Sequence, residues 1–246
     1  AGVVHVGRKA LFTDSLVFGI TNRQWDASKV ITLSAGTLRR CRISQNYLLT
    51  CVVQPVAHVS GDAGTIEDCE ISDNYGYRCG GVDCSAKCNL RNTLITRCQA
   101  SPNGYALALW LEKDGCAVSG CRIVGNVWDS SKGVTVISCS GWASAAFENC
   151  LIAGNRTYDV APISIGGNNT VTFTNTTIAD NESKCGSISC FGTGTSIGNL
   201  VLVNTIISGN TASGLVQTFN PLSEKTTYDI RHCDYPEAPA GDPNRN

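Results

Sequence analysis

A pattern of apolar, small and polar positions recurs along the whole chain. In its clearest copy, residues 147–155, Phe147 is followed by Cys150, Ile152 and Asn155. Nine copies begin at Phe12, Leu38, Ile66, Leu90, Val118, Phe147, Phe173, Leu202 and Ile230. Successive copies of the Ile position are 26, 28, 24, 28, 29, 26, 29 and 28 residues apart, a mean of about 27. A fixed period of this length is typical of a solenoid, in which each repeat forms one coil.

A second apolar alternation lies between the motif copies. It is seen in Val82-Asp83-Cys84, in Leu107-Ala108-Leu109 and in Ile163-Ser164-Ile165. A period of two places one face inward and one outward, which predicts strands, and no helical pattern of three turns occurs. We therefore predict an all-β parallel β-helix of about nine coils with roughly 27 residues per coil. Its equivalent strands are expected to stack in parallel, about 4.8 Å apart.

Two further columns of the repeat are predicted to build structural ladders. The small position holds Cys41, Cys69, Cys121, Cys150 and Cys233, and we expect these to form an inward ladder of thiols. The polar position holds Asn46, Asn74, Asn126, Asn155, Asn181 and Asn210. Asn tolerates left-handed backbone geometry and can bond to its neighbours in a stack, so this column is interpreted as a turn and a hydrogen-bonded ladder.

The repeat also predicts the domain organisation. Residues 1–235 are expected to form one β-helix domain, and the Pro-rich residues 236–246 a tail or linker. The first motif copy is already complete at Phe12, so the chain enters the helix in mid-coil. An uncapped solenoid exposes a strand edge. We therefore expect either further coils before residue 1 or end-to-end association with another copy.

Composition excludes several classes of partner. The formal net charge of the 246 residues is −1, so no nucleic-acid partner is expected. No apolar window is long enough for a transmembrane segment. Fourteen cysteines occur with three histidines, but no paired Cys-x-x-Cys motifs stand at zinc spacing, so we predict no metal site and no cofactor.

The even number of cysteines permits disulfides and suggests an extracellular setting. Most are expected to be buried thiols, because equivalent residues of neighbouring coils have parallel Cβ vectors that suit a disulfide poorly. Residues at the corners have more freedom. Cys51 with Cys79 and Cys88 with Cys116 are therefore the candidate disulfides.

The run Glu148-Asn149-Cys150, followed by Ile152 and Gly154-Asn155, resembles the secreted right-handed parallel β-helix repeat proteins of bacteria. These belong to the pectate-lyase-like superfamily and include polymorphic outer-membrane and autotransporter passenger types. The resemblance covers residues 1 to about 235. It implies a right-handed parallel β-helix at an extracellular or bacterial cell-surface location. It does not imply one activity, because such proteins include lyases, glycoside hydrolases and adhesins.

Candidate functional residues are expected where the repeat varies. Asp83 is expected to be the only acid on the outward face of the second strand series, with Ala108, Ser138, Ser164 and Ser189 as its column neighbours. That face lacks the concentration of Asp, Lys and Arg that a lyase cleft needs, so no catalytic residue is assigned. Exposed aromatic residues could stack on sugar rings, and the candidates are Tyr77, Trp110, Trp128 and Trp142.

The function that these observations favour is a non-enzymatic extracellular or cell-surface rod, either structural and adhesive or glycan-binding. Its partner would be a polysaccharide or a cell-surface glycan. Two alternatives stay open. One is a polysaccharide lyase or glycoside hydrolase, and the other is a filament subunit that self-assembles by end-to-end stacking of coils.

Overall fold

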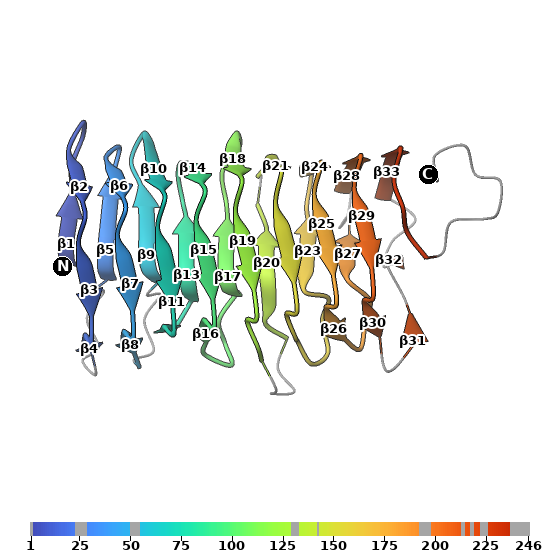
Figure 1. Cartoon of the computed structure of the whole chain (residues 1–246), viewed down its shortest axis with the longest axis horizontal. Helices are drawn as coiled ribbons and strands as arrows, with labels where there is room; N and C mark the ends of the chain where they lie inside the picture. Colours follow the sequence, from blue (N-terminus) through green and yellow to red (C-terminus); the bar gives the residue numbers. More distant parts are fainter. Residues whose placement is uncertain are drawn as a thin grey trace.

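Each repeat copy contributes one layer of strands, which we call a rung. In the computed structural model the rungs follow one another along a single axis (Figure 1). The structure describes residues 2–22, 29–49, 55–128, 133–141, 143–191, 198–212, 215–216, 219–221 and 226–236. Over these ranges it contains strands and no helix, and therefore no apolar helix that could cross a membrane. The all-β parallel solenoid predicted from the repeat is confirmed.

Two long sheets run the length of the solenoid. The first contains β1 (Gly2–Val6), β5 (Lys29–Ser34), β9 (Pro55–Ser60), β13 (Cys79–Cys84), β17 (Ala106–Leu111), β20 (Thr135–Cys139), β23 (Ile163–Gly166), β27 (Ile188–Phe191) and β32 (Phe219–Pro221). The second contains β2 (Leu11–Thr13), β6 (Thr37–Arg39), β10 (Ala63–Glu67), β14 (Lys87–Arg91), β18 (Cys116–Ser119), β21 (Ala145–Glu148), β24 (Thr170–Thr174), β28 (Gly198–Val203) and β33 (Thr226–Arg231).

The remaining sides are built from shorter strands. The third sheet contains β3 (Leu16–Phe18), β7 (Arg42–Ser44), β11 (Glu70–Ser72), β15 (Leu94–Thr96), β19 (Arg122–Val124), β22 (Leu151–Ala153), β25 (Thr177–Ala179) and β29 (Ile206–Ser208). Two small sheets contain β4 (Thr21–Asn22), β8 (Tyr47–Leu48), β12 (Tyr75–Gly76) and β16 (Gln99–Ala100), and then β26 (Glu182–Ser183), β30 (Thr211–Ala212) and β31 (Leu215–Val216).

The structure has about seven turns of roughly 27 residues, so the predicted count of nine coils is slightly too high. Each motif copy marks one rung, and the first two sheets do contain nine strands each. A full turn of the solenoid also has a strand in the third sheet and a strand in one of the two small sheets. The third sheet has only eight strands, and the short sides are covered by one sheet of four strands and one of three.

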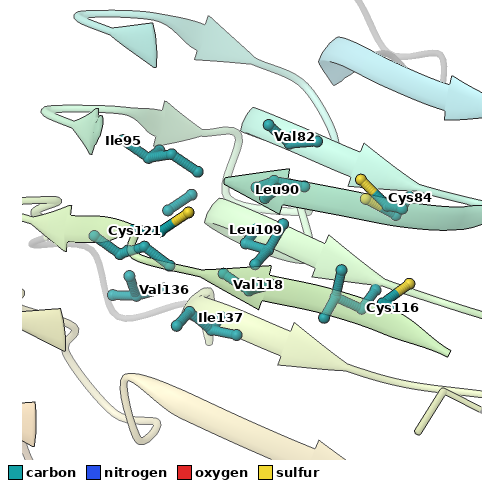
Figure 2. Packing of buried hydrophobic residues seen from close by; sticks show 14 of the residues in the cluster. Val82, Cys84, Leu90, Ile95, Leu109, Cys116, Val118, Cys121, Val136 and Ile137 are labelled. Carbon is teal, nitrogen blue, oxygen red and sulfur yellow. The ribbon is translucent and has the colours of Figure 1, made fainter. Parts of the chain in front are cut away.

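The repeat alignment predicts the strand register correctly. The Ile position pairs with its own equivalent from Val17 through Ile43 to Ile207 along the third sheet. The apolar position five residues earlier does the same along the second sheet. There Phe147 and Phe173 are fully buried and their rings stack with centroids 4.8 Å apart. Inward side chains of the first and second sheets, such as Val82, pack against one another in one core (Figure 2).

The asparagine ladder is confirmed, and it runs inside the solenoid. The Asn155 backbone N–H and Nδ2 donate to Asn181 Oδ1 at 3.1 and 2.9 Å, and Nδ2 also donates to the Ile123 carbonyl at 2.9 Å. Asn155 Oδ1 accepts from the backbone and side-chain nitrogens of Asn126, both at 3.0 Å. Each buried amide therefore satisfies backbone groups of neighbouring rungs.

The predicted left-handed turn geometry of these asparagines is wrong. The positive φ angles fall on the residue immediately before each ladder position, for example Asp73 (φ 57°), Asp180 (φ 53°) and Gly154 (φ 60°). That residue makes the corner, whereas the following Asn points inward. The two roles that the sequence analysis gave to one column are thus divided between adjacent residues.

Candidate functional site

The outward face of the first sheet carries the most varied chemistry of the described chain. One outward column runs through Thr32, His58, Asp83, Trp110, Ser138, Ser164 and Ser189, which pair in register on β5, β9, β13, β17, β20, β23 and β27. The column changes character along the axis. It is ionic at Asp83, aromatic at Trp110, and lined with hydroxyl groups beyond it.

Asp83 lies at the centre of a buried ionic network. Its side chain is fully buried, and its Oδ2 lies 3.6 Å from His58 Nδ1 and 3.5 Å from Arg78 Nε. The other edge of the Arg78 guanidinium bonds to Glu112 Oε1 at 2.8 Å, and His58 Nε2 is 3.2 Å from the Ser85 hydroxyl. Both Asp83 oxygens, His58 Nδ1 and Arg78 Nε are buried without a hydrogen bond, so these ion pairs are the compensation that the buried carboxylate has.

This face has more charged residues beside it than the strand alternation reveals. Arg78 lies in the turn between β12 and β13, and Glu112 follows β17, so neither occupies an outward strand position that the alternation could reveal. Lys29 at the start of β5 also interacts electrostatically with Asp83 and Arg78. Burial lowers the pKa of Lys29, and the negative charge of Asp83 partly opposes that shift.

The predicted neighbour of Asp83 is also corrected. Asp83 pairs with Trp110, and Ala108 lies two residues earlier on the same strand. The apolar alternation continues through Leu107, Leu109 and Leu111, so a register slip of two residues leaves the same face inward. Spacing alone could not distinguish these two registers.

The aromatic group at this point is a stacked pair whose outer member is Tyr105. Trp110 is buried rather than exposed, and its Nε1 donates to the Ser140 hydroxyl at 2.7 Å. Its ring stacks on Tyr105 with centroids 4.3 Å apart at 18°, and the Arg78 guanidinium carbon lies 3.1 Å from the Trp110 centroid. Tyr105 remains 53% exposed. The repeat does not reveal Tyr105, because this residue lies in the loop before β17.

The other predicted aromatic residues do not join this pair. Tyr77 is half-buried, and its hydroxyl oxygen lies 3.5 Å from Asn103 Nδ2. Trp128 is partly buried and packs against the core, which contradicts its prediction as an exposed side chain. Trp142 lies outside the described residues. Of the five candidates, the structure therefore brings Asp83 and Trp110 together.

A pocket of about 370 Å³ opens beside Tyr105. Ser138, Ser164 and Ser189 supply hydroxyl groups from three successive strands, and Asp159 and Cys185 lie in the loops that border them. Ser189 is 4% exposed, and its Oγ and Asp159 Oδ1 are covered without a hydrogen-bond partner. The pocket thus combines one aromatic wall with uncharged hydroxyl groups and one carboxylate. This arrangement suits non-covalent binding of a ligand rich in hydroxyl groups.

The described cysteines are free thiols, and all but the half-buried Cys185 are buried. The predicted disulfide between Cys88 and Cys116 is not formed, and Cys79 also has a free thiol, while its predicted partner Cys51 lies outside the described residues. Core packing accounts for the buried cysteines of the described chain, since Cys behaves as a small hydrophobic residue.

Burial makes most of these thiols poor nucleophiles. It raises the pKa of Cys69 to about 11 and the pKa values of Cys98 and Cys121 to about 12. Cys116 differs, because a hydrogen bond with the Cys84 thiol lowers its pKa. Among the described residues, no group of three or more His, Cys, Asp or Glu side chains could hold a metal ion.

Comparisons with known proteins yield structural similarities alone. No family model and no curated protein match the chain. Among solved structures it is similar to HetL, a pentapeptide repeat protein involved in heterocyst differentiation regulation from the cyanobacterium Nostoc sp. strain PCC 7120. The identity is 10% over 97% of this chain and 92% of that chain, with a TM-score of 0.33.

A second similarity is to the A-module of the Azotobacter vinelandii mannuronan C-5 epimerase AlgE6. Here the identity is 11% over 95% of this chain and 78% of that chain, with a TM-score of 0.33. At these identities and TM-scores, neither protein transfers an activity or a site to this chain.

Proposed function

We propose that this protein is a non-enzymatic β-solenoid rod that binds glycans in the pocket beside Tyr105. The observation that carries the proposal is the exposed Tyr105 ring, which is fixed from behind by Trp110 and forms one wall of a pocket lined by hydroxyl groups. The setting that the proposal assumes is extracellular or at the cell surface.

The pocket suits both kinds of surface that a sugar ring presents, its flat faces and its polar rim. A pyranose presents C–H groups on its flat faces, which pack against an aromatic ring, and hydroxyl groups around its rim, which need hydrogen-bond partners. Tyr105 offers the flat apolar surface, and Ser138 and Ser164 offer donors and acceptors beside it. The volume of about 370 Å³ lies within the range typical of small-molecule sites.

The same inventory supports binding without turnover. Glycoside hydrolysis ordinarily uses two carboxyl groups on opposite sides of the bond that is cleaved. Among the described lining residues, Asp159 is the one carboxylate, and no Lys, Arg or His accompanies it. The Asp83 carboxylate is fully buried behind Arg78, so a substrate in the pocket does not reach it.

Calorimetry against a panel of oligosaccharides tests the proposal. We expect Tyr105→Ala to weaken binding of any recognised glycan at least tenfold, because the stacking surface is lost. Tyr228→Ala is the matched control, since this tyrosine on β33 is also 40% exposed and lies on a different sheet. Unchanged affinity in a folded Tyr105→Ala variant would contradict the proposal. So would release of reducing ends or unsaturated products from the same panel, because either would indicate turnover.

A further inference from the structure

We infer that the pocket beside Tyr105 selects uncharged sugar units over uronates. This inference rests on the proposed glycan binding and adds the class of sugar. The observation behind it is the charge of the pocket wall. Asp159 contributes a carboxylate, and the other described lining residues carry no positively charged side chain.

Among the described residues, two cationic side chains near this part of the fold make contacts outside the pocket. Arg78 approaches the Tyr105 ring to 5.4 Å, but its guanidinium pairs with Glu112 at 2.8 Å and with the Asp83 carboxylate at 3.5 Å. Lys184 adjoins the pocket residue Cys185, yet its ammonium lies 3.7 Å from the centre of the Tyr158 ring. Neither side chain lines the pocket, so a bound sugar would not contact either cation directly.

Hydrogen-bond chemistry points in the same direction as charge. An ionised carboxylate accepts hydrogen bonds and cannot donate them, so Asp159 suits a ligand that presents hydroxyl donors. An uncharged sugar offers such donors all around its ring. A uronate carries a carboxylate in place of the hydroxymethyl group of the uncharged sugar. That carboxylate offers no donor, and it repels the Asp159 carboxylate in a pocket partly shielded from water.

The serine column completes the neutral recognition surface. Ser138, Ser164 and Ser189 stand at equivalent positions on three successive strands, so their hydroxyls repeat at the spacing of the rungs. Ser138 and Ser164 are partly exposed, whereas the Ser189 hydroxyl behind them is covered and has no hydrogen-bond partner within the protein. Hydroxyl groups can donate or accept, so they bind sugar hydroxyls without supplying the positive charge that a uronate needs.

Matched oligosaccharides that differ only in oxidation at C6 test the inference. Hexasaccharides of glucose, galactose and mannose are compared with those of glucuronate, galacturonate and mannuronate by calorimetry at low salt. For any pair that binds, we expect the uncharged member to bind at least tenfold more tightly. Raising the salt concentration should strengthen uronate binding, because screening weakens the repulsion by Asp159.

Two variants separate charge from shape. Asp159→Asn should raise uronate affinity severalfold and leave affinity for the uncharged member within about threefold. Asp62→Asn removes a carboxylate whose side chain is 74% exposed and which does not line the pocket, so it should change neither affinity. Equal or tighter binding of the uronates to the unmodified protein would overturn the inference while leaving glycan binding intact. Failure of all six hexasaccharides to bind would instead overturn the proposed function.

Discussion

Asp14 and Arg40 show how a single charged contact joins two rungs of the solenoid. Arg40 Nε and a terminal nitrogen each donate to the Asp14 carboxylate at 2.6 Å, and the Thr13 hydroxyl donates to it at 2.9 Å. These bonds, those of Arg40 above all, hold the pKa of Asp14 at about 2. The stabilisation is therefore fully present above pH 3.8 and is lost as the pH falls toward 2.

We predict that Arg40→Gln returns the pKa of Asp14 toward its ordinary value of 3.8, because the charged donor is removed. A carboxyl carbon NMR titration measures this directly. Arg231→Gln is the control, since Arg231 pairs with Asp229 on β33 and should leave Asp14 unchanged. A pKa near 3.8 for Asp14 in the unmodified protein would show that the pair does not persist in solution.

Residues of the candidate site show where prediction from the sequence stops. The alternation correctly placed Asp83 and Trp110 on the outward face of the first sheet. It could not show that both are buried, because their cover comes from Tyr105 and Arg78 in loops that do not follow the repeat. The pocket was missed for the same reason, since Asp159 and Cys185 also lie in such loops.

At the scale of the element, the asparagine ladder ties successive rungs through buried amides. We predict that Asn155→Ala lowers the free energy of unfolding by about 3 kcal/mol, because it leaves buried groups of Asn126 and Ile123 without partners. Urea denaturation followed by circular dichroism measures the loss. Gln99→Ala on β16 removes an exposed amide and should cost about 1 kcal/mol or less. Similar losses in the two variants would contradict a structural role for the ladder.

The ladder is interrupted at Cys98, which occupies the Asn position between Asn74 and Asn126. The Cys98 thiol lies 3.6 Å from the Ile71 carbonyl, and the Asn126 side chain reaches the Ile95 carbonyl in the same way. We predict that Cys98→Asn stabilises the fold by about 1 kcal/mol, because an amide there can bond to the rungs on both sides.

Thermal unfolding of the variant, compared with that of Cys121→Asn, measures the effect. Cys121 is equally buried but belongs to the small column, where the ladder offers an amide no partners, so the control should be destabilised. A lower melting temperature for Cys98→Asn than for the unmodified protein would show that this rung requires the smaller side chain.

Elements were predicted well where inward residues determine the register. Along the third sheet the Ile position must face the core, so a slip of one residue would expose it, and the observed pairing follows the repeat. On β17 three alternating leucines permitted two registers, and the sequence analysis chose the one that the structure does not have. The corner residues were also misassigned, because Asn favours both a left-handed turn and a buried ladder.

The whole molecule is a stack in which each rung contacts its neighbours, and this arrangement should govern how it opens. Stability of such a repeat protein is roughly the sum of rung and interface contributions, so a terminal rung with one neighbour is held less strongly than a central rung with two. Cys121 lies on a central rung between those of Thr93 and Cys150. Cys233 follows β33, the last strand of the second sheet in the described part of the chain.

Buried thiols report this difference, because they react only when the surrounding structure opens. We predict that brief alkylation with N-ethylmaleimide in urea below the unfolding midpoint modifies Cys233 before Cys121, as read by peptide mass spectrometry. Cys185, which is half-buried, should react without urea and serves as the positive control for the alkylation. If Cys233 and Cys121 instead became reactive with the same urea dependence, the rungs would open as one cooperative unit. The nearest-neighbour description would then fail for this solenoid, because its continuous core would couple the ends to the centre.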